Sequence, residues 1–302
     1  MKYDIQIIVT LVTLFFLSQI VGLSILYKDA HVQVVNGTTE VIHGETVIGP
    51  RPEFQGPQTF LWVISAVFIT TGLVLLIVKF QKINWMKLLF FSATFLTVSI
   101  SLGVFIYPTL AYVIALVLAI IKVFKPNKYL HNIIEMLTYA GLVLILAPLF
   151  DIIWIVALLI VISAYDIFAV WRSQHMIKMA KFQIKGGIFT GLFIPLSDMK
   201  KKVKGKIKTG VEIKKRVKVR EAIMGGGDVA FPMLFTGVVM ESLIKLGTIT
   251  KELAFLKVLI IPIVVTLVLL YLFIKGQQGK YYPGMPFITF GCLLGYALVL
   301  II

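Results

Sequence analysis

The chain has 302 residues, of which 59% are apolar and only 14% are charged, and it carries a net charge of +15. Its mean hydropathy is +0.98. A soluble domain of this length would expose far more charge, so the composition excludes a soluble globular protein. Apolar runs of about 20 residues, the length that crosses the hydrocarbon core of a bilayer, recur along almost the whole sequence. Because lipid offers the backbone no hydrogen-bond partners and alternating strands are absent, these runs predict an all-α, polytopic membrane protein.

Nine apolar runs predict nine transmembrane helices. They cover residues 5–27, 60–78, 86–107, 109–121, 133–147, 152–171, 222–246, 254–274 and 285–302. The first run is long and lacks a small-residue cleavage site, so we interpret it as a retained span rather than a cleaved signal peptide. The connectors at Tyr107-Pro108 and at residues 148–151 are so short that their flanking helices must be antiparallel neighbours.

Most of the 29 Lys and Arg residues fall in alternate loops. Because cationic loops stay in the cytoplasm, this bias predicts a cytoplasmic N-terminus and a C-terminus outside, in the cell membrane if the chain is prokaryotic. The chain then divides into an N-terminal six-helix half (1–172), a basic cytoplasmic loop (173–221) and a C-terminal three-helix half (222–302).

The two long loops have different character. The outer loop, 28–59, contains alternating residues on both sides of Asn36-Gly37, which predicts a small β-hairpin. The sequence Asn36-Gly37-Thr38 also matches a glycosylation acceptor, but the turn is favoured. The inner loop begins with an amphipathic segment, 176–185, expected at the membrane surface. The lysine-rich residues 200–220 favour a solvated tail near anionic lipid over a nucleic-acid site.

Acidic residues inside the spans need an explanation, because an ionised carboxylate in hydrocarbon costs about 3 kcal/mol or more. Most acids of this chain lie in loops or at helix ends. Glu135 is expected near the start of the fifth span, and Glu241, three turns into the seventh, is favoured as a structural acid. Asp166 and Asp228 have no such explanation.

Asp166 and Asp228 are predicted to reach the same depth. Asp166 precedes Arg172 by six residues and so lies roughly 9 Å inside the inner boundary of a helix. Asp228 follows Arg220 by eight residues, which gives roughly 12 Å by the same rise. The sixth and seventh spans run in opposite directions and are joined on the inner side, so the two carboxyls should meet.

Two carboxyls held a few ångströms apart in low dielectric share one proton. The ionised member can take a proton from an attacking water, and the protonated member can donate to the developing oxyanion of a peptide carbonyl. This chemistry needs no metal and no cofactor, and the four histidines are scattered over different loops. Cys292 lies in an apolar run and is expected to pack. Gly225 and Gly227 would allow a helix or a substrate backbone to approach the acid closely.

A third feature precedes the last span, in Tyr281-Tyr282-Pro283-Gly284-Met285-Pro286. Two prolines and a glycine cannot continue a helix, so they leave backbone groups unpaired. This turn is predicted on the same inner face as the aspartates. Its free backbone could bind an extended substrate strand.

Together these motifs resemble the presenilin and signal peptide peptidase family of intramembrane aspartyl proteases. The resemblance rests on Tyr165-Asp166 late in the sixth span, on Gly225-Gly226-Gly227-Asp228 early in the seventh, and on the prolines that open the ninth. Nine spans in this order cover the chain end to end. The chain is similar to a compact microbial presenilin homologue, with the orientation of presenilins.

The resemblance implies roles for individual residues. Asp166 and Asp228 would be the catalytic pair, Tyr165 would pack or hydrogen-bond near them, and Gly225 and Gly227 would be the family's motif glycines. Pro283 matches the first position of the family's Pro-Ala-Leu motif. Gly284 and Met285 depart from its Ala and Leu, and Pro286 keeps the proline that often follows.

The implied activity is that of an aspartic endopeptidase that cleaves single-span transmembrane helices. Its expected partners are these helical substrates and the lipid bilayer, with no nucleic acid, metal or cofactor. The alternative function is a proton- or cation-coupled transporter that uses the same pair of aspartates. It is disfavoured because the sequence has no convincing inverted repeat and both acids lie toward one face.

Overall fold

The computed structural model describes residues 5–35, 38–54, 56–125, 127–173, 179, 182–183, 186–194, 222–276 and 282–302. Helices account for most of these residues. The long helices are α1 (Ile5–Asp29), α2 (Pro57–Lys79), α3 (Ile83–Gly103), α4 (Pro108–Phe124), α5 (Lys128–Leu146), α6 (Ile152–Ile167), α8 (Gly226–Lys245), α10 (Ile260–Lys275) and α11 (Met285–Ile301). Short helical segments extend three of them: η1 (Ala147–Leu149), η2 (Phe168–Arg172) and α9 (Lys251–Val258).

Seven helical segments are long and apolar enough to cross a membrane by length and composition. They correspond to α1, α2, α3, α5 with η1, α6 with η2, α8, and α9 with α10. The shorter apolar helices α4 and α11 have 17 residues each. The helical architecture is therefore confirmed, whereas the count of nine crossings and the orientation in the membrane stay predictions.

Two small antiparallel sheets interrupt the helical pattern. Strands β1 (Ala30–Val35) and β2 (Thr38–His43) pair with Val35 opposite Thr38, which confirms the predicted hairpin. Its turn, Asn36-Gly37, lies outside the described residues, as do most of the amphipathic segment and the lysine-rich run. Two described members of that segment, Met179 and Phe182, pack against the cluster of Val74, Met86 and Ile188.

The second sheet corrects the predicted start of the seventh span. Residues 222–225 form strand β4 (Ala222–Gly225), which pairs with β3 (Gly191–Ile194), and the helix begins only at Gly226. Glycine is a poor helix former, and three consecutive glycines favour an extended entry into the helix. The helical rise used to place Asp228 therefore does not hold over these residues, since a strand advances about 3.3 Å per residue, and the depth itself stays a prediction.

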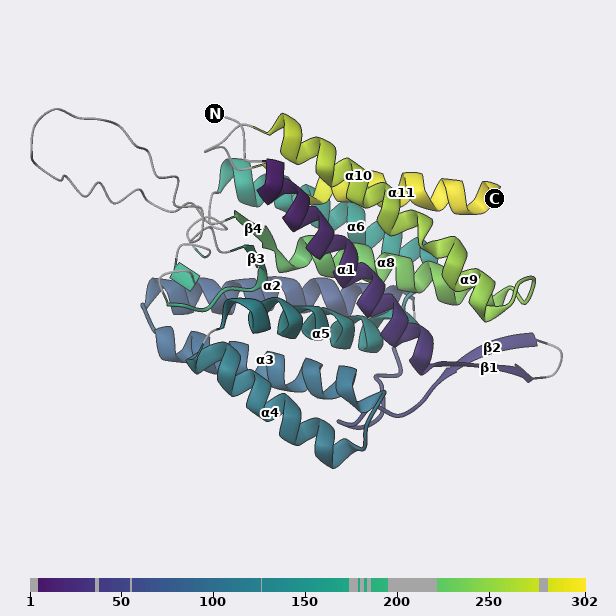
Figure 1. Cartoon of the computed structure of the whole chain (residues 1–302), viewed down its shortest axis with the longest axis horizontal. Helices are drawn as coiled ribbons and strands as arrows, with labels where there is room; N and C mark the ends of the chain where they lie inside the picture. Colours follow the sequence, from purple (N-terminus) through teal and green to yellow (C-terminus); the bar gives the residue numbers. More distant parts are fainter. Residues whose placement is uncertain are drawn as a thin grey trace, which may run out of the picture.

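Helix α8 lies at the centre of the bundle, where it packs against α1, α5, α6 and α11 (Figure 1). In its apolar window 72% of the residues are buried, more than in any other candidate span of the described chain. Figure 1 shows the β1–β2 hairpin and the end of α11 at one end of the bundle, and β3 and β4 at the other. The start of α8 therefore lies at the β3–β4 end.

Glycines allow a close contact between α10 and α11. A Cβ at Gly295 would lie 2.8 Å from the Cα of Ile261, and one at Gly291 would lie 3.1 Å from the Cα of Val265. Small residues four apart let two membrane helices approach closely. Cys292 is fully buried beside this contact, as expected for a packing residue.

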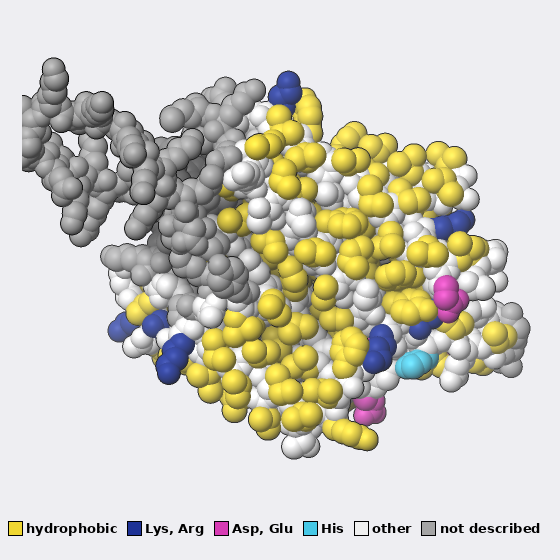
Figure 2. All heavy atoms as spheres, viewed as in Figure 1, with side chains coloured by type: hydrophobic (Ala, Val, Ile, Leu, Met, Phe, Trp, Pro, Cys, Tyr) yellow, Lys and Arg dark blue, Asp and Glu magenta, His cyan; other side chains and the backbone are white. Residues whose placement is uncertain are grey.

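The surface matches a membrane environment. On the face drawn in Figure 2, hydrophobic side chains form a broad continuous band, and charged side chains gather toward the two ends of the bundle. An apolar band flanked by charge is typical of a protein embedded in lipid.

A buried polar cluster holds the hairpin to the far end of α8. His43 Nδ1 lies 2.8 Å from Asp29 Oδ2, and His43 Nε2 lies 3.2 Å from Glu241 Oε1. Arg51 also pairs with Asp29 at 2.7 Å. Glu241 is therefore a structural acid, because its partner belongs to the end of β2 rather than to a functional site.

This cluster predicts a pH-dependent stability. Burial lowers the pKa of His43, but contacts with Asp29 and Glu241 outweigh burial and raise that pKa above its usual value. A raised folded-state pKa stabilises the fold fully below the unfolded value of about 6.5, and this stabilisation is lost as the pH rises through the folded-state value. We expect His43→Gln to lower the thermal unfolding midpoint at pH 6 and to have less effect at pH 9. The exposed His31→Gln is the control, and equal effects of His43→Gln at both pH values would contradict the prediction.

Candidate active site

Asp228 lies in the first turn of α8. Gly225 is the residue that caps this helix, so Asp228 occupies the third helical position. Asp228 therefore has the position of the acid in a capping box, and the helix dipole also favours negative charge there. A Cβ at Gly225, three residues before the acid, would lie 3.2 Å from Asp228 Oδ2, which is a tight contact.

Asp166 lies at the opposite end of its helix, one residue before α6 ends at Ile167. A single π-helical turn, η2, follows it. The side chain is buried, and Oδ2 accepts a hydrogen bond from the backbone N–H of Met285 at 3.1 Å. Met285 is the first residue of α11, so Asp166 satisfies N–H groups that a helix start leaves unpaired.

The start of α11 brings the two aspartates together. While Met285 donates to Asp166, a Cβ at Gly284 would lie only 3.0 Å from Asp228 Oδ1. One dipeptide therefore contacts both carboxyls, and the carboxyls interact electrostatically. Deeper in the bundle, a hydrogen bond of 2.7 Å between Ser163 and Thr289 also joins α6 to α11. The predicted meeting of Asp166 and Asp228 is supported by these contacts, although the helical depth used for Asp228 was not.

Other residues predicted for the site lie at different distances from the pair. The ring of Tyr165 meets Phe68 on α2 edge-on, with ring centroids 5.7 Å apart. Gly227 is exposed, and a Cβ there would meet only the ring of Phe231, at 3.5 Å. Pro283 is buried, and Pro286 occupies the second position of α11.

The turn before α11 was expected to offer its N–H groups to a substrate, but in the structure an N–H of this turn binds an aspartate. Both prolines lack an N–H, and the N–H of Met285 donates to Asp166. The carbonyl oxygen of Gly284 accepts from Ile288 within the helix. Binding of an extended substrate by this turn therefore stays a prediction that concerns its remaining carbonyl groups.

Sequence reasoning missed a polar stripe on α5. Glu135 was expected near a helix start, but α5 begins at Lys128, so Glu135 lies two turns inside and is fully buried. Lys122 of α4 lies 2.9 Å from its Oε1. Tyr139 lies one turn further along α5 and is also buried. The sequence did show Glu135, Lys122 and Tyr139 as polar residues in or next to apolar runs. It does not show that Lys122 pairs with Glu135.

Further polar side chains hold the elements around Asp228. Asn132 of α5 donates to the carbonyl oxygen of Phe193 and accepts from its N–H, both at 2.9 Å. His131 Nε2 lies 3.0 Å from the carbonyl oxygen of Gly191. From α1, Gln19 donates to the carbonyl oxygen of Val229 at 2.9 Å. Strand β3 and the start of α8 are thus fixed by side chains of neighbouring helices.

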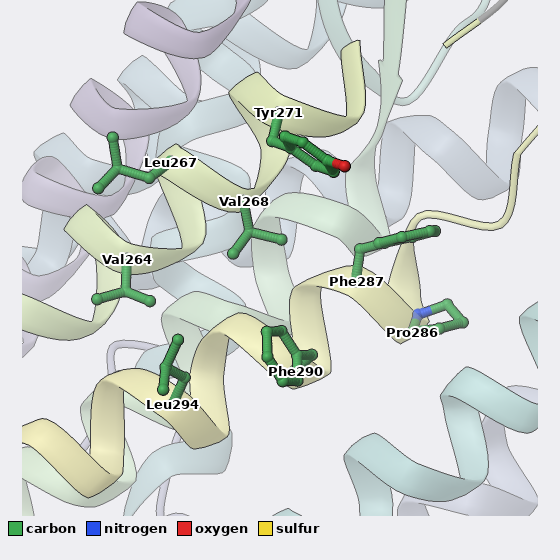
Figure 3. A pocket seen from close by; sticks show the side chains of 8 residues that line it. All are labelled: Val264, Leu267, Val268, Tyr271, Pro286, Phe287, Phe290 and Leu294. Carbon is green, nitrogen blue, oxygen red and sulfur yellow. The ribbon is translucent and has the colours of Figure 1, made fainter. Parts of the chain in front are cut away.

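An apolar groove runs along the outside of α10 and α11 (Figure 3). At one end it reaches Pro286 and Phe287, next to the turn that contacts the aspartates. Neither aspartate lines this groove, so it is not the place of the chemistry. Within the residues that the structure describes, no group of three or more His, Cys, Asp or Glu side chains could hold a metal ion.

Comparisons with known proteins agree with this geometry. The family model described as signal-peptide peptidase, presenilin aspartyl protease matches residues 49–302. A comparison with curated protein sequences found no match. Two similar solved structures are a presenilin family intramembrane aspartate protease in space groups C222 and P2. The first has 14% identity and a TM-score of 0.58, and covers 97% of this chain and 98% of that chain. The second has 15% identity and a TM-score of 0.56, and covers 97% and 96%.

A bundle of apolar helices in which one turn contacts two aspartate carboxyls is typical of the class of intramembrane aspartyl proteases. The chain is a member of the signal-peptide peptidase and presenilin aspartyl protease family, which confirms the resemblance predicted from its motifs. It is therefore an aspartic endopeptidase and an integral, multi-pass membrane protein.

The close approach of Gly284 to Asp228 gives a first prediction for the site. In Gly284→Ala, the new Cβ must displace the Asp228 carboxyl by a few tenths of an ångström. We expect a decrease of about 10-fold in kcat, since a displacement of about 1 Å can cost about 100-fold. Cleavage of a transmembrane peptide measures it. The control is Gly72→Ala in α2, where a Cβ would meet nothing within 4 Å. A wild-type kcat in Gly284→Ala would contradict the prediction, because the Asp228 carboxyl would then move without loss of activity.

Proposed function

We propose that Asp166 and Asp228 are the catalytic dyad and that they hydrolyse peptide bonds of transmembrane-helix substrates. The observation that carries this proposal is the joint contact of both carboxyls with Gly284 and Met285. A structural pair of acids would be expected to have a cationic partner. Among the described residues, neither aspartate forms a salt bridge with Lys, Arg or His, so their charge is not neutralised by a base.

The chemistry follows from two carboxyls that cannot both be ionised at close range. The ionised carboxyl takes a proton from water as the water attacks the peptide carbonyl. The protonated carboxyl donates its proton to the carbonyl oxygen. When the tetrahedral intermediate collapses, the carboxyl that took the proton from water gives it to the leaving amine, and the other carboxyl takes a proton back from a hydroxyl of the intermediate. The surrounding helices exclude bulk water, so the few charges inside the site act at low dielectric.

The substrate must be extended where it is cut, since a helical peptide bond is shielded by its own turn. Strand β4 ends beside Asp228 and offers a backbone edge for such a segment. On β3, the outward groups of Gly191 and Phe193 are occupied by His131 and Asn132. Among the described residues, no third strand pairs with β4. The free edge of β4 therefore favours strand addition on that side, which leads the substrate toward the dyad.

The place of the enzyme in the cell follows from the charge bias. With most Lys and Arg in alternate loops, the β3–β4 end and the dyad lie toward the cytoplasmic side of the cell membrane. Substrates then enter sideways from the bilayer and are cut in their inner half. The partners are single-span helices and lipid, with no cofactor.

Replacement of either aspartate tests the dyad. We expect Asp166→Asn and Asp228→Asn each to reduce cleavage of a labelled transmembrane peptide by about 1,000-fold or more, because an amide can neither accept nor supply the proton. Purified protein in detergent or in proteoliposomes is suitable, with fragments identified by mass. Both variants should fold, since the amide oxygen can still accept the backbone N–H.

The matched control is Asp151→Asn, an exposed acid at the start of α6 that should keep wild-type activity. Undiminished cleavage in both dyad variants would refute the proposal. Proton or cation flux in the same proteoliposomes without any cleavage would favour the transporter instead.

A further inference from the structure

Helix α5 presents polar groups to the start of α8. His131, Glu135 and Tyr139 are spaced four residues apart and so share one face of the helix. His131 Nε2 lies 3.8 Å from Glu135 Oε1, and the Lys122 ammonium lies 2.9 Å from the same oxygen. Lys122 also donates to Thr94 at 2.9 Å. The ion pair is almost completely buried, with 3% of the Lys122 side chain and none of the Glu135 side chain exposed.

Tyr139 stands between this ion pair and the catalytic helix. Tyr139 is only 5% exposed, and its buried hydroxyl has no hydrogen-bond partner among the described residues. A Cβ at Gly226 would lie 3.0 Å from that hydroxyl. Gly226 is the first residue of α8, two positions before Asp228. Tyr139 is also within electrostatic range of both Glu135 and Asp228.

The Tyr139 hydroxyl has a hydrogen to donate and an oxygen that can accept, and a suitable group lies on each side of it. The Glu135 carboxylate, one turn back on α5, can accept the hydroxyl hydrogen, and its Oε2 has no hydrogen-bond partner in the described part of the chain. With the hydrogen directed there, the oxygen lone pairs face the first turn of α8, where helix geometry leaves N–H groups unpaired. A buried polar group without a partner is costly, so this orientation is favoured on both sides.

We propose that Tyr139 is a positioning residue for Asp228, oriented by the buried Lys122–Glu135 ion pair. In this arrangement Glu135 fixes the hydroxyl, the hydroxyl supports the first turn of α8, and that turn fixes the carboxyl of Asp228 against Gly284. Gly226 has no side chain because the hydroxyl occupies the space that a Cβ would fill. The inference rests on the proposed function, since it gives Asp228 a catalytic role.

Tyr139→Phe tests the proposal, because it removes the hydroxyl and keeps the ring. We expect kcat for a transmembrane peptide to fall about 10-fold or more, as for a small displacement of a reacting group, with an unchanged KM. The thermal unfolding midpoint should stay within a few degrees of wild type. The matched control is Tyr296→Phe on α11, whose ring packs edge-on against Phe235 on α8. Wild-type kcat in Tyr139→Phe, or a loss equalled by Tyr296→Phe, would overturn the proposal.

A double-mutant cycle tests the link to the ion pair. Lys122→Met and Glu135→Gln are made together, so that no unpaired buried charge remains. We expect this double variant to lower kcat when Tyr139 is present and to have little further effect in Tyr139→Phe, because coupled residues are not additive. Equal effects in both backgrounds would overturn the link.

Hydrogen exchange separates this inference from the proposed function. In Tyr139→Phe, the backbone amides of residues 222–230 should exchange roughly 5-fold faster, because the first turn of α8 loses its contact with the hydroxyl, and those in Tyr296→Phe should not. Unchanged exchange in Tyr139→Phe would overturn the positioning role. If the wild-type protein cleaves no substrate, the proposed function fails, and exchange alone then decides whether Tyr139 holds the start of α8.

Discussion

The site depends on one helix start, that of α11. Two prolines and a glycine prevent the chain from becoming helical before Met285, so the first N–H groups of α11 need partners from outside the helix. Asp166 supplies one, and the absence of a Cβ at Gly284 lets Asp228 come within contact of the same turn. The turn of Gly284 and Met285 therefore contacts both carboxyls and holds them near each other. Without it, the buried Asp166 would lose the N–H group from which its carboxyl accepts.

Both aspartates lie where helices begin or end, not in their middles. Asp228 is in the first turn of α8 and Asp166 precedes the last residue of α6, while a strand leads into one helix and a π-helical turn follows the other. Irregular backbone at membrane depth is tolerated only where protein or water surrounds it. Here α5 and α1 surround it, with Asn132 on Phe193 and Gln19 on Val229. The most buried helix thus carries the group that has to be held most rigidly.

The sequence revealed the features that are costly or that break a helix locally. Asp166, Asp228 and the prolines of α11 were predicted because each conflicts with an apolar helix, and the β1–β2 hairpin because Asn36-Gly37 is a turn signal. Strand β4 was missed because a short apolar run before glycines resembles the start of a helix. The pairing of Lys122 with Glu135 and that of Gln19 with Val229, 210 residues apart, were not predictable, since tertiary packing creates both.

The closeness of the two aspartates can be measured directly. Asp166→Cys and Asp228→Cys are combined in a Cys292→Ala background, which removes the one native cysteine, and a protease site is placed among residues 200–220. A short bifunctional thiol reagent is added, and the loop is then cut. We expect the halves to stay joined on a gel and to separate when only one of the two cysteines is present. Halves that separate in the double variant as readily as in the single ones would contradict the pairing of Asp166 with Asp228.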